Sequence, residues 1–278
     1  GKTNGTASST VLVKDIRPGD RVNSTATDLV NVYGTLFFVA ADPNAGRELW
    51  KSNGTAEGTV LVKDILPGGG QSRISNGTAV YRTLYFSATD GIHGQELWKS
   101  DGTEAGTVMV KDLTPGPSGS SGTNLSSFEM GNFTNIYGTL FFTAYYNDTY
   151  YTWKTNGTQA GTIPLFETYG PGAGQPKPMF TFLNNRIYFF NRPAEESDLY
   201  FMSMDRSGGD VRPLLLFYED DFNITYYPEL ALVNNMFYLS GRADPFFGHK
   251  MVRTDGTEGG TVILEDDANT SSNAGDPQ

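Results

Sequence analysis

A unit of about fifty residues recurs along this chain, and a repeat of that length constrains the fold more than any other feature of the sequence. Two copies are nearly identical, RELWKSNGTAEGTVLVKDI from Arg47 to Ile65 and QELWKSDGTEAGTVMVKDL from Gln95 to Leu113. Looser copies occupy Tyr151 to Glu167 and Lys250 to Asp266, and a degenerate one occupies Met202 to Tyr218. Units of this kind stack on their neighbours, because one unit alone cannot bury its apolar face.

Each unit contains four short strand-like runs separated by turn signals. In the second unit these runs are Thr78–Tyr81, Leu84–Thr89, Glu96–Ser100 and Thr107–Leu113. The second run is continuously apolar at its centre, which is typical of a strand buried on both faces. An Asn-Gly or Asp-Gly pair separates the third and fourth runs, and it predicts a hairpin with a type I′ turn, since both residue types tolerate positive φ.

A four-stranded antiparallel meander repeated at this period is typical of a β-propeller blade. The 33 glycines, 14 prolines and 13% aromatic residues suit many short strands joined by tight turns. We therefore expect an all-β fold, a five-bladed β-propeller-like array of four-stranded antiparallel blades. The blades are expected at 24–65, 76–113, 127–167, 178–218 and 228–266. An open array of the same sheets, or a sandwich, is the alternative.

The motif itself resembles a known repeat. The segments Glu48–Thr55 and Glu96–Thr103, each followed by Gly-Thr-Val and Val-Lys-Asp, are similar to the ELWKSDGT repeat of large bacterial surface and secreted proteins, which is often described as hyalin-like or propeller-like. The resemblance is close over residues 3–165, fades from Phe166 to Lys250 and returns in part at Thr254. It implies a propeller-like extracellular module and supplies no catalytic residues.

The chain also opens with half a copy, TNGTASSTVLVKDI from Thr3 to Ile16, which is one strand more than five blades need. We divide the sequence into a surplus strand and joint (1–23), one propeller-like repeat domain (24–267) and a carboxy-terminal tail (268–278). The predicted assembly strand consists of Val11, Leu12, Val13, Lys14, Asp15 and Ile16.

An unpaired strand edge is costly, so the surplus strand needs a partner. Three arrangements are open: a fifth strand on an outer edge of its own molecule, displacement of Thr261–Asp266, or strand addition to a neighbouring copy. Head-to-tail contacts that do not close into a ring generate filaments. We expect strand exchange and a homopolymer, because both ends of the chain carry the same type of strand.

Asn-X-Ser/Thr triplets are unusually frequent. They lie at Asn4, Asn23, Asn53, Asn76, Asn124, Asn132, Asn147, Asn156, Asn223 and Asn269. Asn4, Asn53 and Asn156 belong to the Asn-Gly-Thr turn of the repeat, but the others need a different cause. We interpret the excess as N-glycosylation, which predicts covalent glycans and an extracellular protein, either secreted or at the cell surface.

Composition argues against several classes of partner and site. A net charge of −11 without a basic stripe disfavours nucleic acid and anionic membranes. No apolar run approaches the roughly 20 residues of a spanning helix. The chain has no cysteine and only 2 histidines, so disulfides, thiol nucleophiles and multi-histidine metal sites are not expected.

Catalytic candidates are weak. Glu129 and Glu229 lie near the starts of predicted inner strands, where a glycosidase would place its two carboxylates, but positions on the solvated rim explain them better. His93 and His249 each stand beside glycine, far from other motifs, and we interpret them as surface residues. On these grounds we expect a protein that is not an enzyme.

No cofactor is expected, with calcium as the one candidate to consider. The acidic positions are Asp15, Asp64 and Asp112 in the Val-Lys-Asp motif and the runs Glu219–Asp221 and Glu265–Asp267, but their spacing matches no calcium loop. Alternating exposure along a strand explains the repeated Lys-Asp more simply.

The repeated tryptophans allow two interpretations of function. Trp50, Trp98 and Trp153 occupy one position of the repeat, and a large aromatic there favours packing between blades. The first interpretation is a non-enzymatic, glycosylated extracellular structural subunit that assembles head to tail. The alternative is a carbohydrate-binding, lectin-like propeller module in which these rings stack on sugars.

Overall fold

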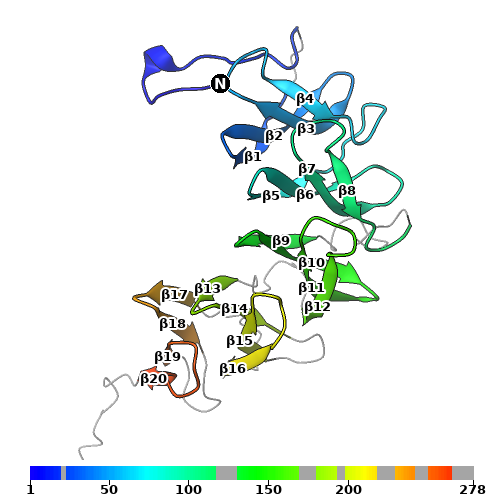
Figure 1. Ribbon diagram of the computed structural model, residues 1–278. Coiled ribbons are helices and arrows are strands. Elements are labelled where there is room, and N and C mark those ends of the chain that lie inside the picture. Colours follow the sequence, from blue (N-terminus) through cyan, green and yellow to red (C-terminus); the bar gives the residue numbers. More distant parts are fainter. Residues whose placement is uncertain are drawn as a thin grey trace, which may run out of the picture. The chain divides into compact units, whose positions relative to one another are not determined.

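The computed structural model describes residues 1–19, 23–116, 130–168, 180–192, 198–217, 229–241 and 250–264. The chain forms two compact units, residues 1–173 and 174–278. Within the described residues every regular element is a strand, apart from one 3-10 turn, η1 (Ala7–Ser9). Figure 1 labels the strands in chain order.

The first unit contains three four-stranded antiparallel sheets, each a meander in which consecutive strands pair. The first sheet comprises β1 (Thr27–Val32), β2 (Thr35–Asp42), β3 (Gly46–Ser52) and β4 (Val60–Lys63). The second comprises β5 (Ser75–Val80), β6 (Thr83–Thr89), β7 (Gln95–Ser100) and β8 (Val108–Lys111). The third comprises β9 (Gly131–Ile136), β10 (Thr139–Tyr146), β11 (Thr149–Thr155) and β12 (Ile163–Thr168).

The second unit contains two more sheets of the same design. The fourth sheet comprises β13 (Thr181–Leu183), β14 (Arg186–Asn191), β15 (Leu199–Asp205) and β16 (Arg212–Phe217). The fifth comprises β17 (Glu229–Val233), β18 (Met236–Gly241), β19 (Lys250–Thr254) and β20 (Val262–Leu264). The predicted all-β fold with five four-stranded antiparallel sheets is therefore confirmed.

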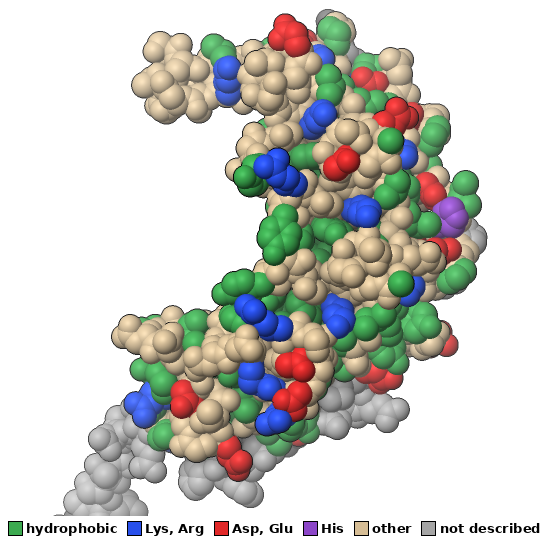
Figure 2. Space-filling model, viewed as in Figure 1, with side chains coloured by type: hydrophobic (Ala, Val, Ile, Leu, Met, Phe, Trp, Pro, Cys, Tyr) green, Lys and Arg blue, Asp and Glu red, His purple; other side chains and the backbone are tan. Residues whose placement is uncertain are grey.

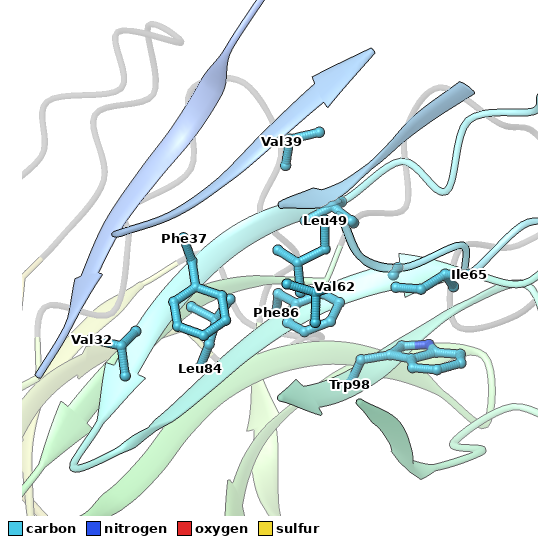
Figure 3. Packing of buried hydrophobic residues seen from close by; sticks show 11 residues of the cluster. Val32, Phe37, Val39, Leu49, Val62, Ile65, Leu84, Phe86 and Trp98 are labelled. Carbon is cyan, nitrogen blue, oxygen red and sulfur yellow. The ribbon is translucent and has the colours of Figure 1, made fainter. Parts of the chain in front are cut away.

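Consecutive sheets of the first unit pack face to face, and their two faces differ. We call the side that carries the repeated tryptophan the tryptophan face of a sheet. In the second sheet it consists of Leu84, Phe86, Ala88 and Trp98, which pack on Phe37, Val39, Leu49, Val62 and Ile65 of the first sheet (Figure 3). The tryptophan face of the third sheet, Leu140, Phe142, Ala144 and Trp153, packs in the same way on Tyr85, Leu97, Val110 and Leu113.

The same arrangement recurs inside the second unit, where Met202 and Val252 occupy the place of the tryptophan. Tyr188, Phe190 and Phe201 of the fourth sheet pack on Phe237, Leu239 and Val252 of the fifth. The rings of Tyr188 and Phe237 lie 4.7 Å apart. The apolar second strand of each repeat is thus buried on both faces, as its sequence predicts.

The connection between the third and fourth strands is a hairpin, but the type I′ turn predicted for it is wrong. β3 and β4 pair, yet seven residues separate them, and in the Asn53-Gly54 pair only Gly54 has a positive φ, 87°. Asn53 instead closes the loop with its side chain: Oδ1 accepts hydrogen bonds from Thr55 N at 3.0 Å and Thr55 Oγ1 at 2.9 Å. This Asx turn gives the backbone a different solution from the short hairpin.

The I′ pattern occurs instead between the first and second strands. Tyr33 and Gly34 have φ of 51° and 89°, and Tyr137 and Gly138 have 48° and 91°. Positive φ at both central positions matches the right-handed twist of the paired strands. Positive φ costs a tyrosine free energy, so the backbone conformation of the turn does not explain why tyrosine occupies this position.

A pair of hydroxyl groups closes the base of the long loop in four of the five sheets. One belongs to the last residue of the third strand and the other to the threonine before the fourth. The pairs are Ser52–Thr59, Ser100–Thr107, Thr155–Thr162 and Thr254–Thr261, each with 2.7 Å between the oxygens. The first hydroxyl also accepts a hydrogen bond from the loop glycine, as in Gly102 N to Ser100 Oγ at 3.0 Å.

In each of the first two sheets, one buried carboxylate holds the chain that leaves the fourth strand. Glu48 is buried and accepts hydrogen bonds from Ile65 N at 3.1 Å and Leu66 N at 3.2 Å. Glu96 accepts the equivalent bond from Leu113 N at 2.9 Å. Burial outweighs these hydrogen bonds and raises the pKa of Glu48 to about 7. The glutamate of the Glu-Leu-Trp-Lys motif therefore connects the third strand to the joint behind the fourth.

The hydroxyl pair predicts a strong coupling between its two residues. Ser100→Ala or Thr107→Val alone leaves one buried hydroxyl without its partner and should lower the free energy of unfolding by about 1–3 kcal/mol. The double variant should cost less than the sum of the two, because both polar groups are then gone. Urea unfolding of the four proteins measures the coupling, with Thr83→Val as a control. Additive losses would contradict the role assigned to the pair.

Glu48 predicts a pH dependence of stability. Its folded pKa of about 7 lies above the ordinary 4.5, so the folded protein binds this proton more tightly than the unfolded chain does. The stabilisation is complete below the unfolded pKa and is lost as the pH rises through the folded pKa. Relative to Glu48→Gln, the wild type should lose on the order of 2 kcal/mol between about pH 4.5 and about pH 8.

Thermal or urea unfolding across this range measures the difference. Glu57→Gln, at an exposed glutamate in the loop of the same sheet, is the control for a change of net charge. If the difference in the free energy of unfolding between the wild type and Glu48→Gln stays constant with pH, folding does not raise the pKa of Glu48.

Candidate functional site

The three tryptophans lie in the packing between structural layers, not at a surface. Trp50, Trp98 and Trp153 are 5%, 6% and 1% exposed. Trp98 and Trp153 each lie in the core between two consecutive sheets. A sugar ring cannot stack on them in this structure, so the carbohydrate-binding alternative loses the residues on which the sequence based it.

The amino-terminal half copy folds into the loop that the repeat predicts. Its turn is closed by Asn4 Oδ1, which accepts hydrogen bonds from Thr6 N at 3.2 Å and Thr6 Oγ1 at 3.0 Å, and Thr10 Oγ1 donates to Thr3 Oγ1 at 2.9 Å. Of the predicted assembly strand, Val11 forms an isolated antiparallel bridge with Lys2. The remaining residues up to Ile16 belong to no strand.

A lysine-to-carbonyl contact joins this segment to the first sheet in the same way as consecutive sheets are joined. In each case the lysine of Val-Lys-Asp, or its equivalent, donates to the carbonyl oxygen of the loop threonine in the next repeat. The three contacts are Lys14 to Thr59 at 2.8 Å, Lys63 to Thr107 at 2.9 Å and Lys111 to Thr162 at 2.8 Å. The half copy therefore takes the place of a preceding sheet.

Apolar packing supports that placement. The tryptophan face of the first sheet contains Phe38, Ala40 and Trp50, and Ile16 packs against it. Ile65 and Leu113, which occupy the same place in their repeats as Ile16, belong to the cores in which Trp98 and Trp153 lie. Leu12, in contrast, is 72% exposed and Val11 is 45% exposed.

The glycosylation triplets fall into two groups in the structure. Asn4, Asn23, Asn53, Asn147 and Asn156 are exposed. Asn76 and Asn132 are half-buried, and their amide nitrogens donate to Met130 O at 2.8 Å and to Thr143 Oγ1 at 3.1 Å, respectively. Asn124, Asn223 and Asn269 lie outside the described residues.

Asn76 and Asn132 have a conformational reason to be asparagine. Both lie where the register of the first strand shifts against the second, with φ of 59° and 58°. Asp28 occupies the same place in the first sheet with φ of 52°. Asparagine and aspartate tolerate this left-handed conformation best, so two more of the triplets follow from the fold.

Three exposed tyrosines were not identified from the sequence as functional. Tyr33, Tyr81 and Tyr137, at the turns between the first and second strands, are 72%, 73% and 68% exposed. β1, β5 and β9 lie in order along one edge of the first unit (Figure 1), where hydrophobic side chains, tyrosine included in that colour, reach the surface (Figure 2). The tyrosine that recurs two residues before each Thr-Leu pair was the available signal.

The weak catalytic candidates are not brought together by the described residues. His93 Nδ1 lies 2.7 Å from Asp90 Oδ2, and this hydrogen bond raises the pKa of His93. Burial alone would raise the pKa of Asp90, but the hydrogen bonds from the main chain and side chain of His93 outweigh it and lower that pKa. Asp90 Oδ1 also accepts from Ile92 N and His93 N, both at 2.9 Å, so the pair braces a turn. Glu129, His249 and the side chain of Glu229 lie outside the described residues.

In the part of the chain that the structure describes, no group of three or more acidic, histidine or cysteine side chains could hold a metal ion. Asp64 and Asp112 lie in that part, whereas 219–221 and 265–267 do not. No helix of the described residues is long and apolar enough to cross a membrane.

Comparison with known proteins gives a fold but no family. No protein-family model and no curated protein matches the sequence. Among solved structures, a puromycin hydrolase mutant complexed with PGG is similar with a TM-score of 0.51 and 14% identity, over 89% of this chain and 39% of that one. TolB from Acinetobacter baumannii has a TM-score of 0.38 at 12% identity, over 87% of this chain and 55% of that one.

The expectation that the protein is not an enzyme is overturned by this comparison. The solved structure of similar fold is a puromycin hydrolase mutant, and a puromycin hydrolase is an enzyme. The chain spans about two fifths of the length of the puromycin hydrolase, 39%, and at 14% identity the similarity establishes the fold. The absence of a recognised catalytic motif in the sequence therefore does not decide whether the protein is an enzyme.

Proposed function

We propose that this chain is a glycosylated extracellular structural subunit that assembles head to tail, with its amino-terminal segment as the connecting element. The observation that carries the proposal is the Lys14 to Thr59 contact of 2.8 Å, because it repeats the contact by which whole sheets are joined. The segment occupies the place of a whole sheet but forms only the isolated Lys2–Val11 bridge. The missing strands of that sheet can therefore come from a second copy of the protein.

The segment offers main-chain groups to such a partner. In complete repeats the fourth strand pairs with the third, as β8 does with β7 through Lys99–Val108 and Leu97–Lys111. In the segment, the corresponding pairing is limited to the Lys2–Val11 bridge within the described residues. A third strand from a second copy would extend this pairing by β-strand addition.

The fifth sheet has the properties of the complementary end. Its outer strand β20 has three residues, and Val262 and Ile263 are 42% and 41% exposed. Met251 in β19 is 49% exposed, whereas Leu49 and Leu97, at the same place in the first two sheets, are 1% and 0% exposed. The face that a following sheet would cover is therefore accessible. In the proposed exchange, residues 11–16 of the next copy take the place of β20, the short strand that pairs with β19.

The extracellular part of the proposal rests on the exposed Asn-X-Ser/Thr triplets and on the resemblance to the ELWKSDGT repeat of surface and secreted proteins. Asn53 and Asn156 are exposed in the loops that follow the third strands, where a bulky glycan reaches solvent without disturbing a sheet.

Assembly should depend on the exposed leucine of the segment. Leu12→Glu places a charge on a side chain that is 72% exposed, so each molecule should remain folded. In a strand exchanged into a second copy the same charge would be buried, and polymers should be lost. Size-exclusion chromatography with light scattering measures the mass, and Leu29→Glu, at a leucine 62% exposed in β1, is the matched control.

Deletion of residues 1–16 should give the same monomer. Polymers that persist in both the Leu12→Glu protein and the deletion variant would contradict exchange through this segment. A wild-type protein that is monomeric at all concentrations would contradict the assembly as a whole.

Glycan occupancy should follow the two structural groups. In protein secreted from eukaryotic cells, Asn53 and Asn156 should carry glycans, whereas Asn76 and Asn132 should not. A glycan on either of the latter two would have to displace an amide that donates to the neighbouring main chain or strand. Mass spectrometry of glycopeptides measures occupancy site by site, and full occupancy of Asn76 in folded protein would contradict the assignment.

A further inference from the structure

A cavity lies between the first and second sheets at the edge where the exposed tyrosines are found. Its volume is about 300 Å³, the lower end of the range for small-molecule sites. The first sheet contributes Tyr33, Phe37 and Lys51 to its lining, and the second contributes Arg82 and Asp101. All of these residues belong to the first unit.

The equivalent place between the second and third sheets is filled by the repeat's own residues. Lys99 Nζ donates to Gly157 O at 2.7 Å, and Tyr85 Oη lies so close to Gly157 that a Cβ there would collide with it. Lys2 makes the same contact with Gly54 O at 2.9 Å. The repeat therefore normally closes this space with a lysine and a tyrosine hydroxyl.

Between the first and second sheets both closing groups differ. Phe37 replaces the tyrosine, so no hydroxyl reaches the loop of the next sheet, and the nearest atom to a Cβ at Gly102 would be Phe37 Cζ at 3.1 Å. Lys51 lies near Asp101 and contributes to lowering the pKa of that carboxyl, behind the hydrogen bonds from Thr103. No hydrogen bond from Lys51 to the carbonyl of Gly102 is formed, in contrast to Lys99.

Arg82 is the third departure from the repeat. It follows Tyr81 in the turn where Gly34 and Gly138 follow the tyrosines of the other two sheets. Its guanidinium lies over the ring of Tyr33, with Cζ 3.9 Å from the ring centre. Within the described chain Arg82 makes no ion pair, so its donors are available to a ligand. The stack fixes the orientation of the guanidinium without using its hydrogen-bond donors.

The chemistry at the mouth of the cavity is that of an acidic sugar site. Arg82 and Lys51 supply two positive charges, and an arginine binds a carboxylate through two parallel hydrogen bonds. Tyr33, which is 72% exposed, supplies an amphipathic aromatic surface. Asp101 supplies a carboxylate that can accept hydrogen bonds from hydroxyl groups. On a chain with a net charge of −11, an anion is held only where basic side chains are placed locally.

We infer that this cavity binds a uronic acid, either as the free monosaccharide or as a residue of an acidic polysaccharide, with its carboxylate on Arg82 and Lys51. The ring of the sugar lies against Tyr33, and Asp101 accepts hydrogen bonds from its hydroxyl groups. The site lies within the first unit and does not depend on the head-to-tail assembly proposed above.

Isothermal titration calorimetry with the full chain tests this inference, with glucuronic acid, an oligogalacturonide, glucose and acetate as the probes. Saturable binding of glucuronic acid is expected, with at least tenfold weaker binding of glucose and of acetate. Tighter binding of the oligogalacturonide would identify the polymer as the source, and equal binding would identify the monosaccharide.

Two variants restore the repeat's own residues and should therefore fold. Arg82→Gly removes the proposed carboxylate ligand and should weaken binding of glucuronic acid at least tenfold. Phe37→Tyr keeps every charge but introduces a hydroxyl group at the place that Tyr85 Oη fills between the second and third sheets. This hydroxyl should occupy the cavity and abolish binding. Arg73→Gly, at an exposed arginine with φ of 49°, matches the first change in charge and residue type and should leave binding unaltered.

Three results would each overturn the inference: no saturable binding of either acidic sugar to the wild type, equal affinity for glucose and glucuronic acid, or unaltered binding in Arg82→Gly. Loss of binding in Arg73→Gly equal to that in Arg82→Gly would also overturn it, because the effect would then be one of net charge. A thermal melt of each variant confirms that binding is compared between folded proteins.

Discussion

The pair of hydroxyl groups at the base of the long loop, present in four of the five sheets, is the interaction on which the repeat depends. Ser52 and Thr59, for example, approach to 2.7 Å, and Thr59 Oγ1 also donates to Thr55 O at 2.6 Å. These bonds satisfy polar groups that the neighbouring sheets bury, and they fix a loop too long to be held by turn geometry alone. A loop fixed in this way presents its threonine carbonyl at a constant place, where the lysine of the preceding repeat can reach it.

Two kinds of interaction hold consecutive sheets together: non-directional apolar packing and a directional hydrogen bond. Apolar side chains such as Phe37, Phe86 and Trp98 supply the area buried between two sheets, which by itself would allow sliding. The Lys63 to Thr107 contact adds a fixed point at the loop end of the interface. The same two terms hold the amino-terminal segment, through Ile16 and Lys14, which is why half a repeat is enough to occupy a sheet's position.

Sequence reasoning found the sheets because their signal is local, and it failed where side chains override local preference. Strand positions and the doubly buried second strand follow from hydrophobic pattern and period. Asn53-Gly54 indicated a short hairpin, but the side chain of Asn53 closes an Asx turn that only the seven-residue spacing reveals. Glu48 was overlooked because its partners, Ile65 and Leu66, are distant in sequence. The strand bulge at Asn76 and Asn132 likewise needs the register of two strands.

Departures from a repeat carry more functional information than the repeat does. Residues that recur in most copies, such as the tryptophan of the first three sheets and the loop threonines, are accounted for by packing and by loop closure. Phe37 and Arg82 occupy places where neighbouring copies have tyrosine and glycine, and both face the same cavity. Each position also varies elsewhere, since the third sheet has Phe141 at the place of Phe37, and the fourth and fifth have Asn185 and Asn235 at the place of Arg82. The two departures face each other across one junction only between the first and second sheets of the described chain. Exposed aromatic residues in left-handed turns, as at Tyr33, carry a conformational cost that contacts with the next sheet offset, since Tyr33 lies against Arg82 and Tyr81 Oη donates to Tyr137 O at 3.2 Å.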